Sequence, residues 1–152
     1  MGDLREIAGA LESVNGDLIQ KLFAIEAGLA TLPQAEIPVK HYFSNGVYAR
    51  EISVPAGSLI IGKMHRFSQI NIVTKGDMSV LTENGWVRMT AGHTFDSPAG
   101  IKRAGYAHED TVWTTICGTD ETDTDKIDEV LTIGTYAEYL ELKEQLLIEK
   151  ET

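Results

Sequence analysis

The sequence has a single cysteine, Cys117, among its 152 residues. One thiol excludes a disulfide framework within the chain and is typical of a reducing compartment, so we expect a cytoplasmic protein. No uninterrupted apolar run approaches the about 18 residues that a membrane-spanning helix needs. The first residues also lack the basic start of a secretory signal. We therefore expect no membrane partner.

Basic residues are few as well. The chain has 13 Lys and Arg against 23 Asp and Glu, which gives a net charge of −10 at pH 7. Residues 32–118 are close to neutral at +1, whereas residues 119–152 carry −8. Acidic ends repel a phosphate backbone, and no basic stripe crosses the middle, so a nucleic-acid partner is not expected. The acidic ends predict solvated helix faces and a charged linker.

Hydrophobic periodicity divides the chain, whose length suits one domain, into four segments. Residues 1–32 repeat apolar side chains at three- and four-residue steps. This predicts an amphipathic helical segment, used either for packing or for oligomerisation. Residues 38–118 contain nine short strand patterns separated by turn residues, which is typical of a β-sandwich or barrel. Residues 119–125 predict an acidic linker, and residues 126–152 a C-terminal helical tail.

Two details of the β segment have structural consequences. Asn84-Gly85 lies between two strand patterns and predicts a two-residue hairpin turn with both residues at positive φ. One continuous strand is predicted from residue 58 to residue 65, so Lys63 and His65 would share a face and point into the barrel.

Two glycine-containing motifs lie in the same segment. The first reads G-x5-K-x-H-x3-Q-x6-G and runs from Gly57 to Gly76. The second reads G-x5-P-x-G-x2-R and runs from Gly92 to Arg103. Together they resemble the two sequence motifs of the cupin family, over residues 38–118. The resemblance implies an all-β core, a single cupin jelly-roll (double-stranded β-helix) barrel, with flanking N- and C-terminal α-helices.

A second resemblance concerns the run from Lys102 to Thr115, which is similar to small uncharacterised cupins of tailed bacteriophages. It implies a protein of the host bacterial cytoplasm or of the virion. Cupins commonly dimerise, and the apolar stripe of residues 4–29 offers a further association surface. We therefore expect a homo-oligomer, either a dimer or a trimer.

The motif positions imply where a metal would bind. In metal-bearing cupins they hold three histidines and one glutamate, and here they are Lys63, His65, Gln69 and Arg103. Lysine and arginine offer no lone pair at neutral pH and repel a divalent cation. A metal site usually needs three or more protein ligands. We therefore expect no metal and no other cofactor.

The same residues favour an anion. Lys63 supplies a mobile charge, and the planar Arg103 guanidinium suits a carboxylate or phosphate. Asn71 has the same parity as Gln69 and adds a polar contact. The leading hypothesis is a non-catalytic phage-type cupin that binds a small anionic ligand through Lys63, His65, Gln69, Asn71 and Arg103, or acts as an assembly or accessory module. Alternatively, the two cations pair with Glu51, Glu109 or Asp110 and merely stabilise the barrel.

Two enzymatic alternatives stay open, and the binding hypothesis is preferred to both. The first is a metal-dependent isomerase or dioxygenase, with the divalent metal held by His65, Gln69 and Cys117. The second is a metal-free epimerase-like site. There His65 would act as base, Lys63 and Arg103 would stabilise an enolate-like charge, and Tyr48 or Tyr106 would supply the acid.

Overall fold

The computed structural model describes residues 18–82 and 84–151, and the predicted helix before Leu18 lies outside them. The helices are α2 (Leu18–Leu29), α3 (Ile127–Leu131) and α4 (Tyr136–Glu151). The strands are β1 (Val39–Ser44), β2 (Val47–Val54), β3 (Leu59–Ile61), β4 (Met64–His65), β5 (Gln69–Lys75), β6 (Asp77–Thr82), β7 (Gly85–Thr90), β8 (Thr94–Ser97), β9 (Ala104–Ala107), β10 (Thr111–Gly118) and β11 (Thr132–Ile133).

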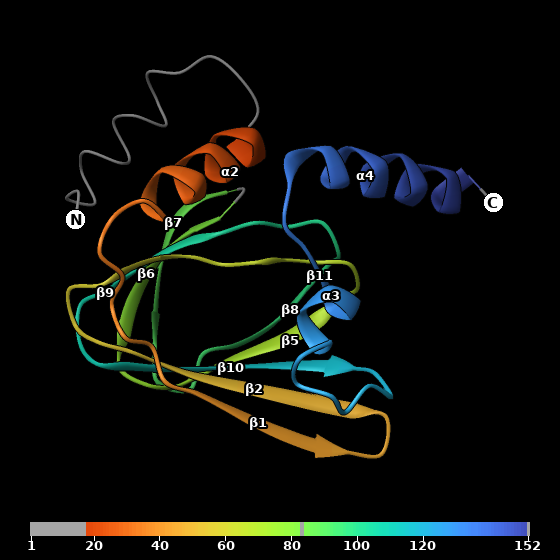
Figure 1. Ribbon diagram of the computed structural model, residues 1–152. Helices are drawn as coiled ribbons and strands as arrows, with labels where there is room; N and C mark the ends of the chain where they lie inside the picture. The colour runs from red at the N-terminus through yellow and green to blue at the C-terminus, as the bar shows by residue number, and fades with distance from the viewer. Residues whose placement is uncertain (1–17, 83, 152) are drawn as a thin grey trace.

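Two antiparallel sheets form the barrel (Figure 1). One has five strands in the order β1-β2-β10-β5-β8, and the other has four in the order β3-β9-β6-β7. Alternate side chains of both sheets point inward and form the core, whose buried members are Val54, Val73, Met78, Val80, Met89 and Ala107. The predicted jelly-roll barrel with flanking helices is confirmed.

Helices α2 and α4 lie together on the side of the barrel opposite β1 and β2 (Figure 1). Leu22 of α2 packs against Leu81 and Ala104 of the four-stranded sheet. Phe23, on the same helix, packs with Met64 and with Tyr139 of α4. In the described stretch, the apolar stripe of α2 is therefore buried against the chain's own barrel.

The β segment departs from the prediction in the strand that contains Lys63. The strand predicted for residues 58–65 is interrupted. Its first part, β3, pairs with β9, and the Gly62 amide still donates to Arg103 O at 2.8 Å. The chain then changes partner, and β4 pairs with β11. Lys63 thus lies between two strands. The hairpin near Asn84 is present, with Gly85 paired to Thr82 and at a positive φ of 96°. Its turn includes residue 83, which lies outside the described residues, so the predicted turn type stays a prediction.

The C-terminal segment closes one end of the barrel. Ile127 and Leu131 of α3 are buried in a cluster with Tyr48 of β2 and Cys117 of β10. Strand β11 follows directly and pairs with β4, with Thr132 opposite His65. A strand within this predicted helical tail was not foreseen. No helix in the described part of the chain is long and apolar enough to cross a membrane.

Candidate functional site

A cavity of about 110 Å³ lies inside the barrel at the end that α3 covers. The structure brings all five predicted ligand residues to its wall, namely Lys63, His65, Gln69, Asn71 and Arg103. Both sheets contribute, and so do α3 and β11 through Asp128, Leu131 and Thr132. Apolar side chains such as Ile52, Met78 and Trp113 make up much of the remaining wall.

Strand register explains the polar part of the wall. Arg50 on β2 pairs with Thr115 on β10, and Thr115 pairs with Asn71 on β5. Residues directly opposite one another in a sheet point to the same face, so these three side chains form one row facing the cavity. Sequence reasoning missed Arg50. The sequence did indicate it, because Arg50 has the same strand parity as Tyr48 and Ile52. A charged side chain at that parity faces the barrel interior.

The amide of Asn71 is oriented by two donors. Its Oδ1 accepts hydrogen bonds from Trp113 Nε1 at 3.1 Å and from Thr115 Oγ1 at 3.0 Å. Asn71 is only 4% exposed, and its Nδ2 has no hydrogen-bond partner among the described residues. A buried donor without a partner costs about 1–3 kcal/mol, so Nδ2 marks a place for an acceptor.

Two guanidinium groups share the cavity wall. Arg103 donates from Nη1 to Ser97 Oγ at 2.8 Å and lies over the Phe95 ring, 5.3 Å from its centre. Arg50 is half-buried, and within the described chain no carboxylate or carbonyl is paired with it. The predicted alternative for Arg103, an ion pair with Glu51, Glu109 or Asp110, stays a prediction.

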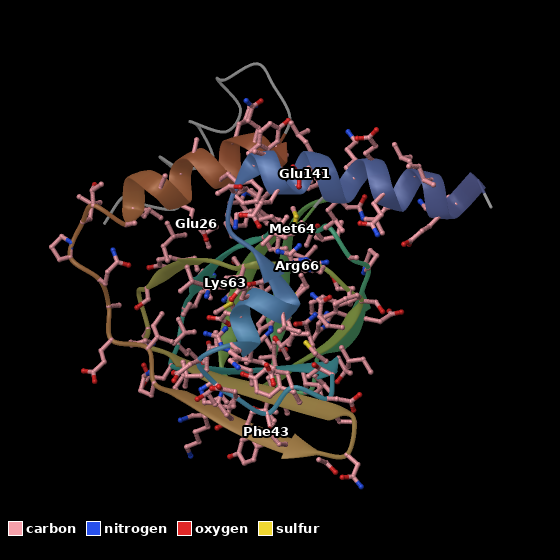
Figure 2. The ribbon with its side chains drawn as sticks, turned by 45° about the vertical axis from the view of Figure 1, so that its right-hand side comes forward. Glu26, Phe43, Lys63, Met64, Arg66 and Glu141 are labelled. Carbon is pink, nitrogen blue, oxygen red and sulfur yellow. The ribbon has the colours of Figure 1, made fainter. Side chains whose placement is uncertain are left out.

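Lys63 makes an ion pair that the sequence did not predict. Its Nζ lies 2.5 Å from Asp128 Oδ2 on α3, and Figure 2 shows Lys63 beside that helix. The expected partners Glu51, Glu109 and Asp110 were wrong for this lysine, because α3 folds over the barrel end. Burial would raise the pKa of Asp128, but the Lys63 hydrogen bond and the nearby positive charges hold it below its usual value.

His65 is neutral in this setting. Burial, followed by the positive charge of Arg50, lowers the pKa of His65 from 6.5 to about 4. Its Nδ1 lies 3.7 Å from the Cys117 sulfur. Burial raises the pKa of the Cys117 thiol to about 11. The pair is therefore an uncharged imidazole beside an uncharged thiol.

The geometry gives little support to the alternative metal site. Within residues 18–82 and 84–151, no three His, Cys, Asp or Glu side chains come together as a ligand set. His65 and Cys117 are a pair of strong donors, so the proposed site would depend on the weak neutral amide oxygen of Gln69 as its third ligand.

The tyrosines proposed as an acid lie in different places. Tyr48 lines the cavity, and its hydroxyl is 2.7 Å from His41 Nδ1. Burial raises the pKa of Tyr48, so its hydroxyl is a poorer acid than usual. Tyr106 is not among the lining residues and packs edge-on against His108.

Comparison with known proteins was informative only at the level of structure. No family model and no curated protein matches the sequence. The ectoine synthase of P. lautus superposes with a TM-score of 0.53, covering 64% of this chain and 75% of that one at 12% identity. The fold is that of a cupin barrel. At such low identity this likeness shows the fold alone.

Other cupin structures superpose less well. KdgF from Halomonas sp. gives a TM-score of 0.47 at 22% identity, over 53% of this chain and 76% of that one. A cupin superfamily protein from Desulfitobacterium hafniense DCB-2 gives 0.49 at 14% identity, over 60% of this chain and 88% of that one.

Proposed function

We propose that this cupin barrel is a non-catalytic binding protein for a small organic anion. One observation carries the proposal. Arg50 and Arg103 line the same cavity as the buried Asn71 Nδ2, which has no hydrogen-bond partner in the described chain. All three present N–H donors and none presents an acceptor.

Charge balance supports an anionic ligand. Of the residues that the structure describes, three cations line the cavity, Arg50, Lys63 and Arg103, against the single carboxylate of Asp128. Asp128 is paired with Lys63, so the Arg50 guanidinium can bind another anion. Positive charge removed from water is costly unless an anion compensates it. A carboxylate bound by a guanidinium fork supplies that compensation through two parallel hydrogen bonds.

The shape of the cavity limits the ligand's size. About 110 Å³ is well below the about 300–1,000 Å³ of pockets that take drug-sized molecules. Ile52, Met78 and Trp113 give it an apolar wall opposite a few N–H donors. Such a cavity suits an anion with a short carbon skeleton.

Two features argue against catalysis. With its pKa near 4, His65 is a weak base at neutral pH. Cys117 has a pKa near 11 and carries almost no thiolate. The binding function therefore remains preferred to the epimerase-like and metal-dependent alternatives.

A thermal-shift panel of acetate, malonate, citrate and inorganic phosphate tests the function. At about 100 times Kd a ligand stabilises the native state by about 2.7 kcal/mol, which raises Tm by several degrees. Arg50→Met should abolish the shift. Lys40→Met is the matched control, because Lys40 is 70% exposed and lies on the edge strand beside Glu51. No shift with any anion, or an equal shift in Arg50→Met, would contradict the proposal.

The finer roles remain predictions. A phage origin, a virion location and an assembly function await a direct test, as does the homo-oligomer. The described part of α2 is already buried on its own barrel, so residues 18–29 offer little apolar surface to a partner. The mass measured by light scattering would show whether the chain associates by another surface.

A further inference from the structure

Helix α3 covers the cavity and brings the chain's own carboxylate to it. Among the described residues, Asp128 is the only carboxylate that lines the cavity, and it bonds Lys63, which also lines it. Both side chains are about half exposed, at 46% for Lys63 and 50% for Asp128, so the ion pair lies at the mouth. An anion that enters at this mouth meets the ion pair first.

The attachment of α3 is strong at two points and weak elsewhere. Ile127 and Leu131 are buried against the barrel, and the Arg66 amide bonds Leu131 O at 2.8 Å. The β11–β4 ladder, by contrast, is two residues long. An ion pair exposed to this degree contributes little to stability. The α3 helix itself is therefore held mainly by Ile127 and Leu131. Strand β11, by comparison, is held by Ile133 and by Arg66 Nε, which donates to Thr132 O at 3.0 Å.

The segments on both sides of α3 can accommodate movement. The acidic run 119–125 precedes it, and its side chains are mostly exposed. Gly134 follows β11, is exposed, and has open space where a Cβ would stand. Few packing contacts and exposed flanks are the features of segments that open locally at low cost.

We propose that α3 is a self-inhibitory cap, in which Asp128 competes with the ligand for Lys63. The inference rests on the proposed anion-binding function. An entering carboxylate takes the Asp128 position on Lys63 while Arg50 and Asn71 bind it from inside. Ion pairs exchange one for one in this step, so Lys63 remains paired throughout.

The same geometry assigns the ligand class. The group that Lys63 now binds is a carboxylate carrying one negative charge, and the site has the donors for one. A phosphate dianion concentrates its charge on one group, whereas malonate spreads two charges over two carboxylates, so phosphate loses more hydration energy on entering so small a cavity. The ligand is therefore a small organic carboxylate rather than a phosphate compound.

Isothermal titration of acetate, malonate and inorganic phosphate into the full-length protein tests both points. Asp128→Asn removes the competing charge and should lower the Kd of a carboxylate about fivefold. That factor corresponds to the strength of an ion pair exposed to this degree. Glu129→Gln is the matched control. It removes the same charge from the same helix at an exposed residue that does not line the cavity, and it should leave Kd unchanged.

A double-mutant cycle separates competition from a general loosening of the cap. In a Lys63→Met background, Asp128→Asn should have no further effect on Kd. If Asp128→Asn still lowered Kd in the Lys63→Met background, the competition would be overturned. Equal affinities of the wild type and Asp128→Asn would overturn it as well. Neither result would contradict the proposed function. Failure of both proteins to bind any anion would overturn the function itself. A phosphate affinity above that of both carboxylates would overturn the ligand class.

Discussion

Asn71 and Thr115 lie directly opposite one another on β5 and β10, and the Thr115 hydroxyl donates to Asn71 Oδ1 at 3.0 Å. This bond, together with that from Trp113 Nε1 at 3.1 Å, determines which end of the amide is the acceptor. The nitrogen end is thereby left without a partner among the described residues. The polarity of the cavity wall thus depends on a hydroxyl and an indole that need not touch the ligand.

Thr115→Val should destabilise the fold by about 1 kcal/mol, because it removes one hydrogen bond at nearly constant volume. It should also weaken anion binding, since Asn71 is then held by Trp113 alone. Chemical denaturation and titration with malonate measure the two effects. Thr114→Val is the control, because Thr114 is on the opposite face of β10. Equal effects of the two variants on binding would contradict the orienting role.

Stability should fall in acid because of His65. The unfolded imidazole takes up a proton near its usual pKa of 6.5, whereas the folded one does so only near 4. The unfolded state therefore binds more protons between these values, and stability declines as pH falls from 6.5 to 4. The full contribution is about 3 kcal/mol.

His65→Gln isolates this contribution. The free energy of unfolding of wild type minus that of the variant should decrease by up to about 3 kcal/mol between pH 7 and pH 4. Urea denaturation at several pH values measures the difference, so that contributions from carboxylates cancel. A difference independent of pH would show that His65 titrates normally.

The reactivity of Cys117 should report on the cap. Cys117 is 5% exposed and packs with Leu131 of α3. Leu131→Ala should loosen that contact and accelerate modification by a thiol reagent about tenfold or more, through local opening. Val130→Ala alters the same helix at a residue that is 39% exposed and should not change the rate. Equal rates in both variants, under conditions where both are folded, would show that α3 does not gate access.

The buried Lys102 should be sensitive to its partner on α2. Its side chain is 1% exposed, lies 3.0 Å from Glu26 Oε1, and has its ammonium 4.3 Å from the centre of the Phe23 ring. Burial lowers the pKa of Lys102, and Glu26 opposes that shift. Glu26→Gln should therefore destabilise the fold by about 2 kcal/mol. Glu36→Gln, at an exposed residue, is the control, and similar losses in both would contradict a specific role for this pair.

The sequence predicted the barrel because its signals are local. Glycines such as Gly57 and Gly76 have positive φ at turns, and strand parity placed Gln69 and Asn71 inward. Arg50 could have been found by the same parity argument. Asp128 could not, because its position at the mouth depends on how Ile127 and Leu131 pack against distant strands. The interruption at Lys63 likewise depends on β4 pairing with β11, which no local pattern encodes.

The central claim is that donors in the barrel cavity bind a small anion, and Asn71→Asp tests it most directly. The substitution keeps the oxygen that accepts from Trp113 and Thr115 but replaces the free N–H donor by a negatively charged acceptor. Isothermal titration of malonate should give one saturable site in the wild-type protein and no binding in Asn71→Asp, with the variant still folded. Unchanged malonate affinity in the folded variant would contradict the account.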